Sequence, residues 1–231
     1  MKSASCDEGP RVVRRNRAAM CRPKTHECIT LHNLGAALAI GAVIPRWVGQ
    51  GGFCGAGVVP PGVPTLPKFS GTITHVSTWN FGGAIGATEA ALASPSILRR
   101  VLAGKNVCHR CEHTADFAAD LGTQIARLDV ARRGTRGDSG PGGPDHLRAL
   151  RWFRDAMSGF YRCGKSPQNK KLHDPLAFSM VLDESVCTLR EVAVDRRQGK
   201  WGSTLAAETN TFAAVNFDQA RFLDSLVGGG M

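Results

Sequence analysis

The chain has 231 residues, of which 42% are apolar, so it is long enough for one large α/β domain or two small ones around a buried core. No apolar run reaches the length of a membrane span, and eight cysteines without a signal-peptide core are too few for a disulfide-stabilised secreted scaffold. These features exclude an integral membrane protein and predict a globular protein of a reducing compartment, the cytoplasm, whose formal net charge of +10 favours anionic partners.

Residues 1–28 show neither helical nor strand periodicity, and we expect them to form a disordered basic tail ahead of one domain at residues 29–231. Seven basic against two acidic side chains in residues 1–24 give this segment +5, half of the net charge. Its arginine-rich composition is also that of an organelle transit peptide, an alternative to the cytoplasm. A second basic excess runs from Arg127 to Lys171. Residues 1–24 contain no aromatic side chain for stacking on bases, and we expect both basic segments to be solvated surface, which disfavours nucleic acid as a partner.

The first half of the expected domain alternates short strands and helices. Periodicity predicts strands at Ile29–Leu34, Trp47–Gly51 and Thr72–Val76 and another within Ile97–Val107, with helices at Ala36–Val43 and Gly86–Ala93. The proline-rich segment Val58–Pro67 is expected to be a loop. Gly51 and Gly52 follow a predicted buried strand, where the chain can turn sharply or approach a ligand closely.

The second half is predicted to continue the alternation. We expect helices at Thr114–Leu128, from Asp145 to Phe160, from Asp174 to Leu182 and after Asp218, strands at Thr188–Arg196 and Phe212–Asn216, a loop at Gly134–Pro144 and a turn at Gly199–Ser203. Strands separated by helices predict an α/β fold with a mostly parallel sheet that helices cover on both faces. Ligands of such folds bind at the ends of the strands.

The segment most typical of a functional site is Lys171-Leu172-His173-Asp174-Pro175-Leu176-Ala177. Asp174 is expected at the N-cap of a helix and Pro175 at its first position. Four apolar side chains share one face of this helix, so its start should be held firmly, with an imidazole and a carboxylate side by side. The plainer alternative is that Asp174 only caps the helix and His173 is an ordinary loop residue.

Several ordered blocks between Ile29 and Val227 resemble the inosine–uridine-preferring nucleoside hydrolase family. Besides His-Asp-Pro-Leu-Ala, they include Gly51-Gly52-Phe53, Lys68-Phe69-Ser70-Gly71, Thr78-Trp79-Asn80-Phe81, Lys105-Asn106-Val107-Cys108-His109 and Gly199-Lys200-Trp201-Gly202-Ser203. The resemblance implies an open, Rossmann-like fold of this family. It also implies hydrolysis of the N-glycosidic bond of a ribonucleoside to a free base and ribose, as in purine and pyrimidine salvage.

The same resemblance implies roles for individual residues. His173 would be the acid that protonates the departing base, for which an imidazole is suited because its ordinary pKa lies near neutrality. Asp174 would be a ligand of a Ca²⁺ ion that holds the ribose hydroxyls and the attacking water. Asn80 would hydrogen-bond the ribose, and an aromatic ring of Phe160 or Tyr161 would stack on the base.

One motif of the family has no counterpart in the sequence. The family opens with a strand that ends in Asp-x-Asp-x-x-x-Asp-Asp, which supplies most Ca²⁺ ligands and the general base. Here the acidic pair Asp7-Glu8 matches nothing, and Asp116 and Asp120 fall on a predicted surface helix. In addition, Gly57 stands where a ribose-contacting asparagine is expected. We therefore expect the first strand to be missing, either in a fragment of an active hydrolase or in a relative without activity.

Other interpretations stay open. Cys108-x-x-Cys111 with nearby histidines, together with Cys21, His26 and Cys28, could form a zinc site, although a second ligand pair of regular spacing is absent. His32, His75 and His146 are expected to be surface or hydrogen-bonded loop residues. From another functional class, the chain could be a non-enzymatic basic module that binds RNA or acidic partners. A homo-oligomer is compatible with the sequence.

Overall fold

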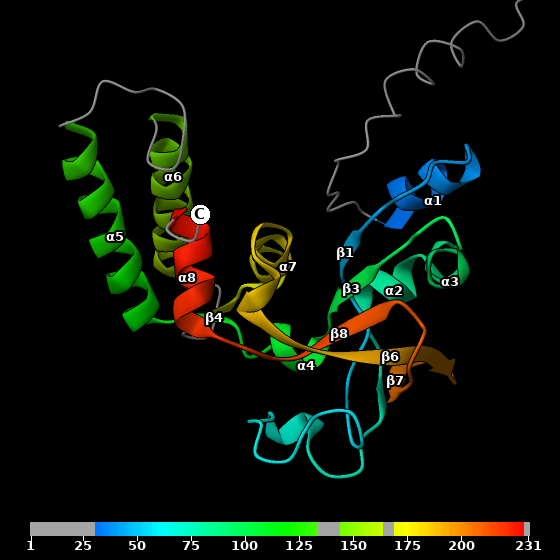
Figure 1. Cartoon of the computed structure of the whole chain (residues 1–231). Coiled ribbons are helices and arrows are strands. Elements are labelled where there is room, and N and C mark those ends of the chain that lie inside the picture. The colour runs from blue at the N-terminus through cyan, green and yellow to red at the C-terminus, as the bar shows by residue number, and fades with distance from the viewer. Residues whose placement is uncertain (1–30, 134–143, 164–168, 229–231) are drawn as a thin grey trace, which may run out of the picture.

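Six strands form one mixed sheet at the centre of the molecule (Figure 1). The structure, a computed structural model, describes residues 31–133, 144–163 and 169–228. In sheet order the strands are β1 (Trp47–Gln50), β3 (Arg100–Ala103), β8 (Thr211–Phe217), β6 (Cys187–Arg197), β7 (Lys200–Leu205) and β2 (His75–Val76). The first three are parallel, and the remaining pairs are antiparallel. The predicted α/β class is confirmed, while the sheet is parallel in one half only.

Helices pack on both faces of this sheet, as predicted. They are α1 (Leu31–Ala39), α2 (Trp79–Gly83), α3 (Ile85–Ala93), α4 (Lys105–Cys108), α5 (Ala115–Arg133), α6 (Pro144–Arg162), α7 (His173–Leu182) and α8 (Gln219–Val227). Two single turns of 3₁₀ helix, η1 (Pro67–Phe69) and η2 (Glu184–Val186), and the small ribbon of β4 (Glu112–His113) and β5 (Lys170–Lys171) complete the described elements. None of the helices in these described ranges is long and apolar enough to cross a membrane.

Two apolar cores lie on opposite faces of the sheet because successive side chains of a strand alternate in direction. In β1, Val48 packs into the core with α5, α6, α7 and α8, whereas Trp47 packs into the core with α1 and α3. In β3, Val101 and Leu102 alternate in the same way. Figure 1 shows the corresponding division, with α5, α6 and α8 on one side and α1, α2 and α3 on the other.

Two predicted elements are wrong. The strand expected at Ile29–Leu34 is a helix where the structure describes it, because Leu34, Ala37 and Leu38 follow helical spacing and pack against α3. The turn expected at Gly199–Ser203 is strand β7. The actual turn is Gln198-Gly199, whose φ angles of +49° and +77° are those of a tight two-residue hairpin.

The other elements are confirmed with shifted ends. Asp218 caps α8, since its carboxylate accepts hydrogen bonds from the backbone N–H groups of Ala220 and Arg221 at 2.9 and 3.0 Å. The predicted helix from Asp145 begins at Pro144. The expected tail at residues 1–28 and most of the loop at Gly134–Pro144 lie outside the described residues.

The turn that follows β1 depends on a glycine without space for a side chain. A Cβ atom at Gly51 would lie 2.2 Å from the ring of Phe81, which is fully buried. We expect Gly51→Ala to lower the free energy of unfolding by about 1–3 kcal/mol, because a ring in a close-packed core cannot move aside freely.

Gly82→Ala is the matched control, because nothing lies within 4 Å of its Cβ position on helix α2. Alanine there should raise stability by up to about 1 kcal/mol through its helix propensity. Urea denaturation of the two variants measures the difference, and equal stabilities would contradict this packing.

Candidate functional site

The loops that leave β1 and β3 are fixed side by side at the carboxyl ends of these parallel strands. The N–H of Gly51 donates to the carbonyl of Ala103 at 3.1 Å, and the N–H of Lys105 donates to the carbonyl of Gly52 at 2.9 Å. The buried side chain of Asn106 accepts from the N–H of Cys54 and donates to a carbonyl of β8, at 3.1 and 2.9 Å. In α/β folds this edge of the sheet is where ligands bind.

Helix α7 presents His173 at the same edge. The buried residues Leu176, Ala177 and Met180 pack into the core below β1 and β3, so the start of the helix is held as predicted. The helix begins two residues earlier than expected, because the N–H of Leu172 donates to the carbonyl of Cys111 at 2.8 Å and fixes Leu172 as the N-cap. The predicted capping role of Asp174 is therefore wrong. Its carboxylate is exposed in the first turn.

The imidazole of His173 is stacked on that of His109. Their ring centroids are 4.8 Å apart, with 28° between the ring planes. The Nε2 atom of His173 is buried, and among the described residues it has no hydrogen-bond partner. The Nδ1 atom of His109 lies 3.0 Å from the Nζ atom of Lys68. A buried imidazole nitrogen without a partner is costly unless a ligand supplies one.

Asn80 is connected to this pair of histidines through β1. Its side-chain amide donates to the backbone carbonyl of Gln50, at 3.0 Å, and to the Gln50 side-chain oxygen. The Gln50 amide in turn donates to the thiol of Cys108 at 3.2 Å, and Cys108 precedes His109. The structure thus brings Asn80, Asp174 and His173 to one edge of the sheet, and the Asn80 amide N–H groups are already occupied.

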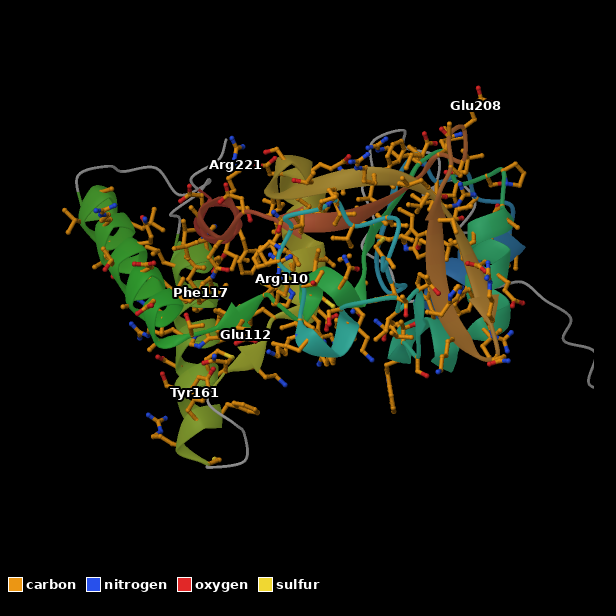
Figure 2. All side chains as sticks on the ribbon, turned by 90° about the horizontal axis from the view of Figure 1, so that it is seen from below. Arg110, Glu112, Phe117, Tyr161, Glu208 and Arg221 are labelled. Carbon is orange, nitrogen blue, oxygen red and sulfur yellow. The ribbon has the colours of Figure 1, made fainter. Side chains whose placement is uncertain are left out.

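Phe160 and Tyr161, predicted to face the base, contact the β4–β5 ribbon instead of His173. The hydroxyl of Tyr161 donates to the carbonyl of His113 at 2.7 Å and accepts from the N–H of Lys170 at 3.0 Å. The Nζ atom of Lys170 lies 5.0 Å from the centre of the Phe160 ring. Figure 2 shows Tyr161 on the same side of the molecule as Glu112 of this ribbon. The contacts of both aromatic residues are thus with the ribbon and not with the two stacked histidines.

Burial and nearby lysines keep the two imidazoles uncharged near neutral pH. Burial lowers the pKa of His109 to about 4, and Lys68 contributes further. Burial also lowers the pKa of His173, while the carboxylate of Asp174 acts in the opposite direction. The thiol of Cys108 stays protonated, since burial raises its pKa to about 11. Near neutrality His173 can therefore donate a hydrogen bond from a neutral ring more readily than a proton from a charged one.

The described residues do not fit the expected Ca²⁺ ion. Calcium takes six to eight oxygen ligands, usually from several carboxylates. Within residues 31–133, 144–163 and 169–228, no three or more histidines, cysteines, aspartates or glutamates gather as metal ligands would. Asp174 therefore lacks companion ligands in this part of the chain, and we derive no chemical step through a metal.

The same finding weighs against the zinc interpretation for the described residues. The thiol groups of Cys108 and Cys111 are buried, and burial raises the pKa of both. Zinc binds thiolates, so such thiols are poor ligands. Cys21, His26 and Cys28 lie outside the described residues. His75 is hydrogen-bonded as expected, with its Nε2 atom 3.0 Å from Asp195.

Sequence reasoning missed Gln50, Lys68 and the role of His109. Gln50 had a usable signal, since it lies near the end of the predicted buried strand Trp47–Gly51 and precedes two glycines. A polar side chain at the carboxyl end of a parallel strand is typical of a ligand site. Lys68 and His109 belong to two of the blocks that resemble the family, but no signal in the sequence pairs them, because only the tertiary fold brings η1 to the end of α4.

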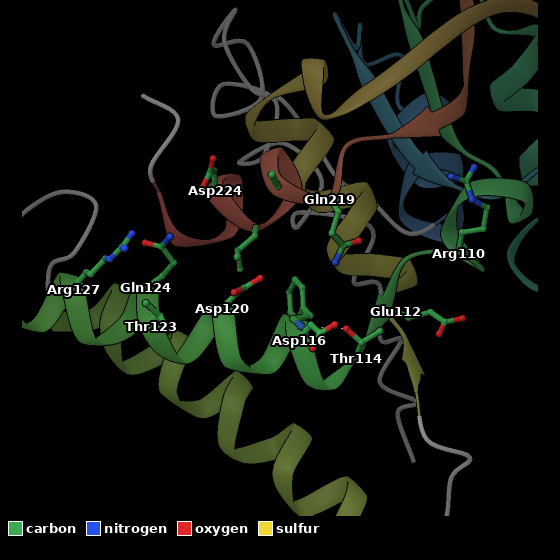
Figure 3. Close-up of a pocket in the computed structure, with 13 residues that line it drawn as sticks. Arg110, Glu112, Thr114, Asp116, Asp120, Thr123, Gln124, Arg127, Gln219 and Asp224 are labelled. Carbon is green, nitrogen blue, oxygen red and sulfur yellow. Dashed lines mark hydrogen bonds between the residues drawn. The ribbon is translucent and has the colours of Figure 1, made fainter. Parts of the chain in front are cut away.

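A separate groove of about 610 Å³ runs between α5 and α8 (Figure 3). Asp116, Asp120 and Asp224 face it from both helices, and Arg110 and Arg127 lie toward its ends. None of the site residues predicted from the sequence lines this groove. The expectation that Asp116 and Asp120 lie on the surface of an amphipathic helix is confirmed.

Two solved structures with a similar fold are nucleoside hydrolases. No family model and no curated protein matches the sequence. A plant nucleoside hydrolase, the PpNRh1 enzyme, is 20% identical, with a TM-score of 0.50 over 85% of this chain and 58% of that one. A purine-preferring ribonucleoside hydrolase from Gardnerella vaginalis is 17% identical, with a TM-score of 0.50 over 87% and 58%. The chain thus has the expected nucleoside hydrolase-like fold and spans less than two thirds of either structure.

The lowered pKa of His109 predicts how stability depends on pH. Between about pH 6.5 and pH 4 the unfolded chain binds a proton at this residue and the folded chain does not, so stability should fall as the pH is lowered through this range. His109→Gln removes the titrating group and should make the loss of stability smaller. Thermal unfolding of both proteins across this range measures the effect, and parallel curves would contradict it.

Proposed function

We propose that this site binds a ribonucleoside and belongs to an enzyme that hydrolyses the N-glycosidic bond, releasing a free base and ribose. The observation that carries the proposal is the imidazole of His173, which is held at the carboxyl ends of β1 and β3 with its buried Nε2 atom unpartnered among the described residues. The fold shared with ribonucleoside hydrolases supports the same substrate class.

The proposed reaction adds water across the bond between C1′ and the base nitrogen. The bonding electron pair leaves with the base, which gains a proton, while the sugar gains the hydroxyl group. Positive charge develops on the sugar as this bond breaks. His173 would support departure of the base by a hydrogen bond or proton directed at it. Asn80 keeps a free side-chain oxygen among the described residues, which could accept from a ribose hydroxyl.

Asp174 would act beside His173 as a fixed negative charge. Its carboxylate opposes the lowering of the His173 pKa and so favours the protonated ring in the transition state. That Asp174 is a Ca²⁺ ligand stays part of the proposal, although the described residues offer it no companion ligands. Calorimetric titration with CaCl₂, with and without ribonucleoside, separates the two roles, since only a ligand role requires Ca²⁺ to bind.

Removal of the imidazole tests the central assignment. We expect the purified chain to release base and ribose from a ribonucleoside such as inosine or uridine, and His173→Ala to lower the turnover number by about 100-fold or more. His146→Ala is a matched control, because its Nε2 atom is likewise buried and unpartnered among the described residues, but on α6. Chromatography of the released base measures the rates.

Two results would overturn the proposal. One is a wild-type protein that neither releases base nor binds any ribonucleoside in a calorimetric titration. The other is an active protein in which His173→Ala and His146→Ala have the same turnover number. Circular dichroism of each variant confirms that its fold is kept.

Phe160 and Tyr161 enter the proposal as aromatic faces for the base. Because the Tyr161 hydroxyl is engaged by His113 and Lys170, Phe160 is the residue to change. We expect Phe160→Ala to raise the KM of a ribonucleoside roughly two- to tenfold, the strength of one aromatic stack. Trp152→Ala on the exposed side of the same helix is the control. An unchanged KM for Phe160→Ala would remove this residue from the site.

A further inference from the structure

Four lysines from three separate segments surround the stacked histidines. Lys68 lies on η1, Lys105 begins α4, and Lys170 and Lys171 form β5. Each of them contributes, after burial, to the lowered pKa of His109 or His173, and Lys105 and Lys171 contribute to both. The charge of Lys68 also lowers the pKa of Lys171, again after burial. The ammonium groups of Lys68 and Lys171 are therefore close enough to repel each other.

Few negative charges among the described residues balance this cluster. Lys171 forms an ion pair with Glu112, and Asp174 is the carboxylate beside His173. Four lysines against these two carboxylates leave two positive charges. Lys68, Lys105 and Lys170 have no salt bridge to any described residue, and both imidazoles are neutral near pH 7.

Hydrogen-bond contacts hold the ammonium groups of two unpaired lysines at the site. The Lys68 Nζ atom is 3.0 Å from His109, and the Lys105 Nζ atom donates to the carbonyl of Ser77 at 2.8 Å. Thr78, the next residue along the chain, is more than nine-tenths buried, and its hydroxyl has no hydrogen-bond partner among the described residues. Ammonium and hydroxyl groups are both donors that bind phosphate oxygens.

A neutral ribonucleoside would leave these positive charges unbalanced, whereas one phosphate group carries nearly two negative charges near neutral pH. Building on the proposed function, we propose that the substrate of this site is a ribonucleoside monophosphate, whose phosphate group binds Lys68 and Lys105 while the base lies at His173. Hydrolysis then gives a free base and a ribose phosphate, and water supplies the hydroxyl of the sugar and the proton of the base.

The size of the cluster favours a mononucleotide over RNA. A nucleic-acid strand is bound by a basic groove that follows several successive phosphates. Here the lysines converge on one pair of stacked rings, which suits a single phosphate group. RNA is thus the competing ligand that the experiment must distinguish.

Calorimetric titrations with inosine, inosine 5′-monophosphate and 3′-monophosphate, ribose 5-phosphate and a short single-stranded RNA test the inference. At low salt we expect one monophosphate to bind the intact chain at least about tenfold more tightly than inosine, since charge-assisted hydrogen bonds are strong. Raising NaCl from 50 to 300 mM should remove most of this preference, because salt screens the exposed lysines.

Substitutions of the lysines test whether they cause the preference for a monophosphate. In the double variant Lys68→Met with Lys105→Met, the affinity for the monophosphate should be within about twofold of that for inosine. Lys200→Met, an exposed lysine at the β6–β7 turn, is the control and should keep the preference. Thermal unfolding shows whether each variant is folded.

The outcomes separate this inference from the proposed function. Equal or tighter binding of inosine than of both monophosphates would overturn the inference and leave a nucleoside hydrolase. Tighter binding of the RNA than of both monophosphates would also overturn it. If ribose 5-phosphate binds as tightly as the monophosphates and inosine does not bind, no base is recognised. The proposed function then fails, and the nucleotide assignment fails with it.

Discussion

The site depends on the packing of α7 against the carboxyl ends of two parallel strands. Leu176, Ala177 and Met180 are buried below β1 and β3, which fixes the first turn of the helix and hence the ring of His173. Without this apolar contact the imidazole would be a solvated loop side chain. With it, the ring is stacked on His109, which follows the loop that leaves β3. A hydrophobic interaction thus determines where the polar chemistry can occur.

A second constraint is electrostatic. The edge of the sheet collects lysines around two imidazoles that burial has made neutral, so the histidines add no charge to the repulsion among the lysines. The usual compensation would be carboxylates, but in the part of the chain that the structure describes only Glu112 and Asp174 act on these lysines and histidines. Uncompensated positive charge lowers the stability of the ligand-free protein and favours the binding of an anion. A binding site can keep such a cost, whereas a region optimised for stability alone would not. It also explains why the described residues suit a phosphate better than a calcium ion.

Much of the fold could be predicted from the sequence, because the spacing of apolar residues shows which side of a helix or strand is buried. The helix at Ala115–Arg133 and the strand at Trp47–Gln50 follow directly from their apolar residues. Strand β7 was missed because Gly199-Lys200-Trp201-Gly202-Ser203 resembles a turn, and only the antiparallel pairing with β6 makes it extended. The site was predictable in part. His173 and Asn80 belong to contiguous motifs, whereas the lysine cluster joins residues that are far apart in the chain and meet only after folding.

The most direct measurement is the ¹⁵N NMR signal of the imidazole ring of His173 during a titration with a ribonucleoside or its monophosphate. If its unpartnered Nε2 atom meets the base, this signal shifts as the ligand saturates, while that of His146, equally unpartnered among the described residues, stays in place. A ligand that saturates the protein and leaves the His173 signal unmoved would contradict the account.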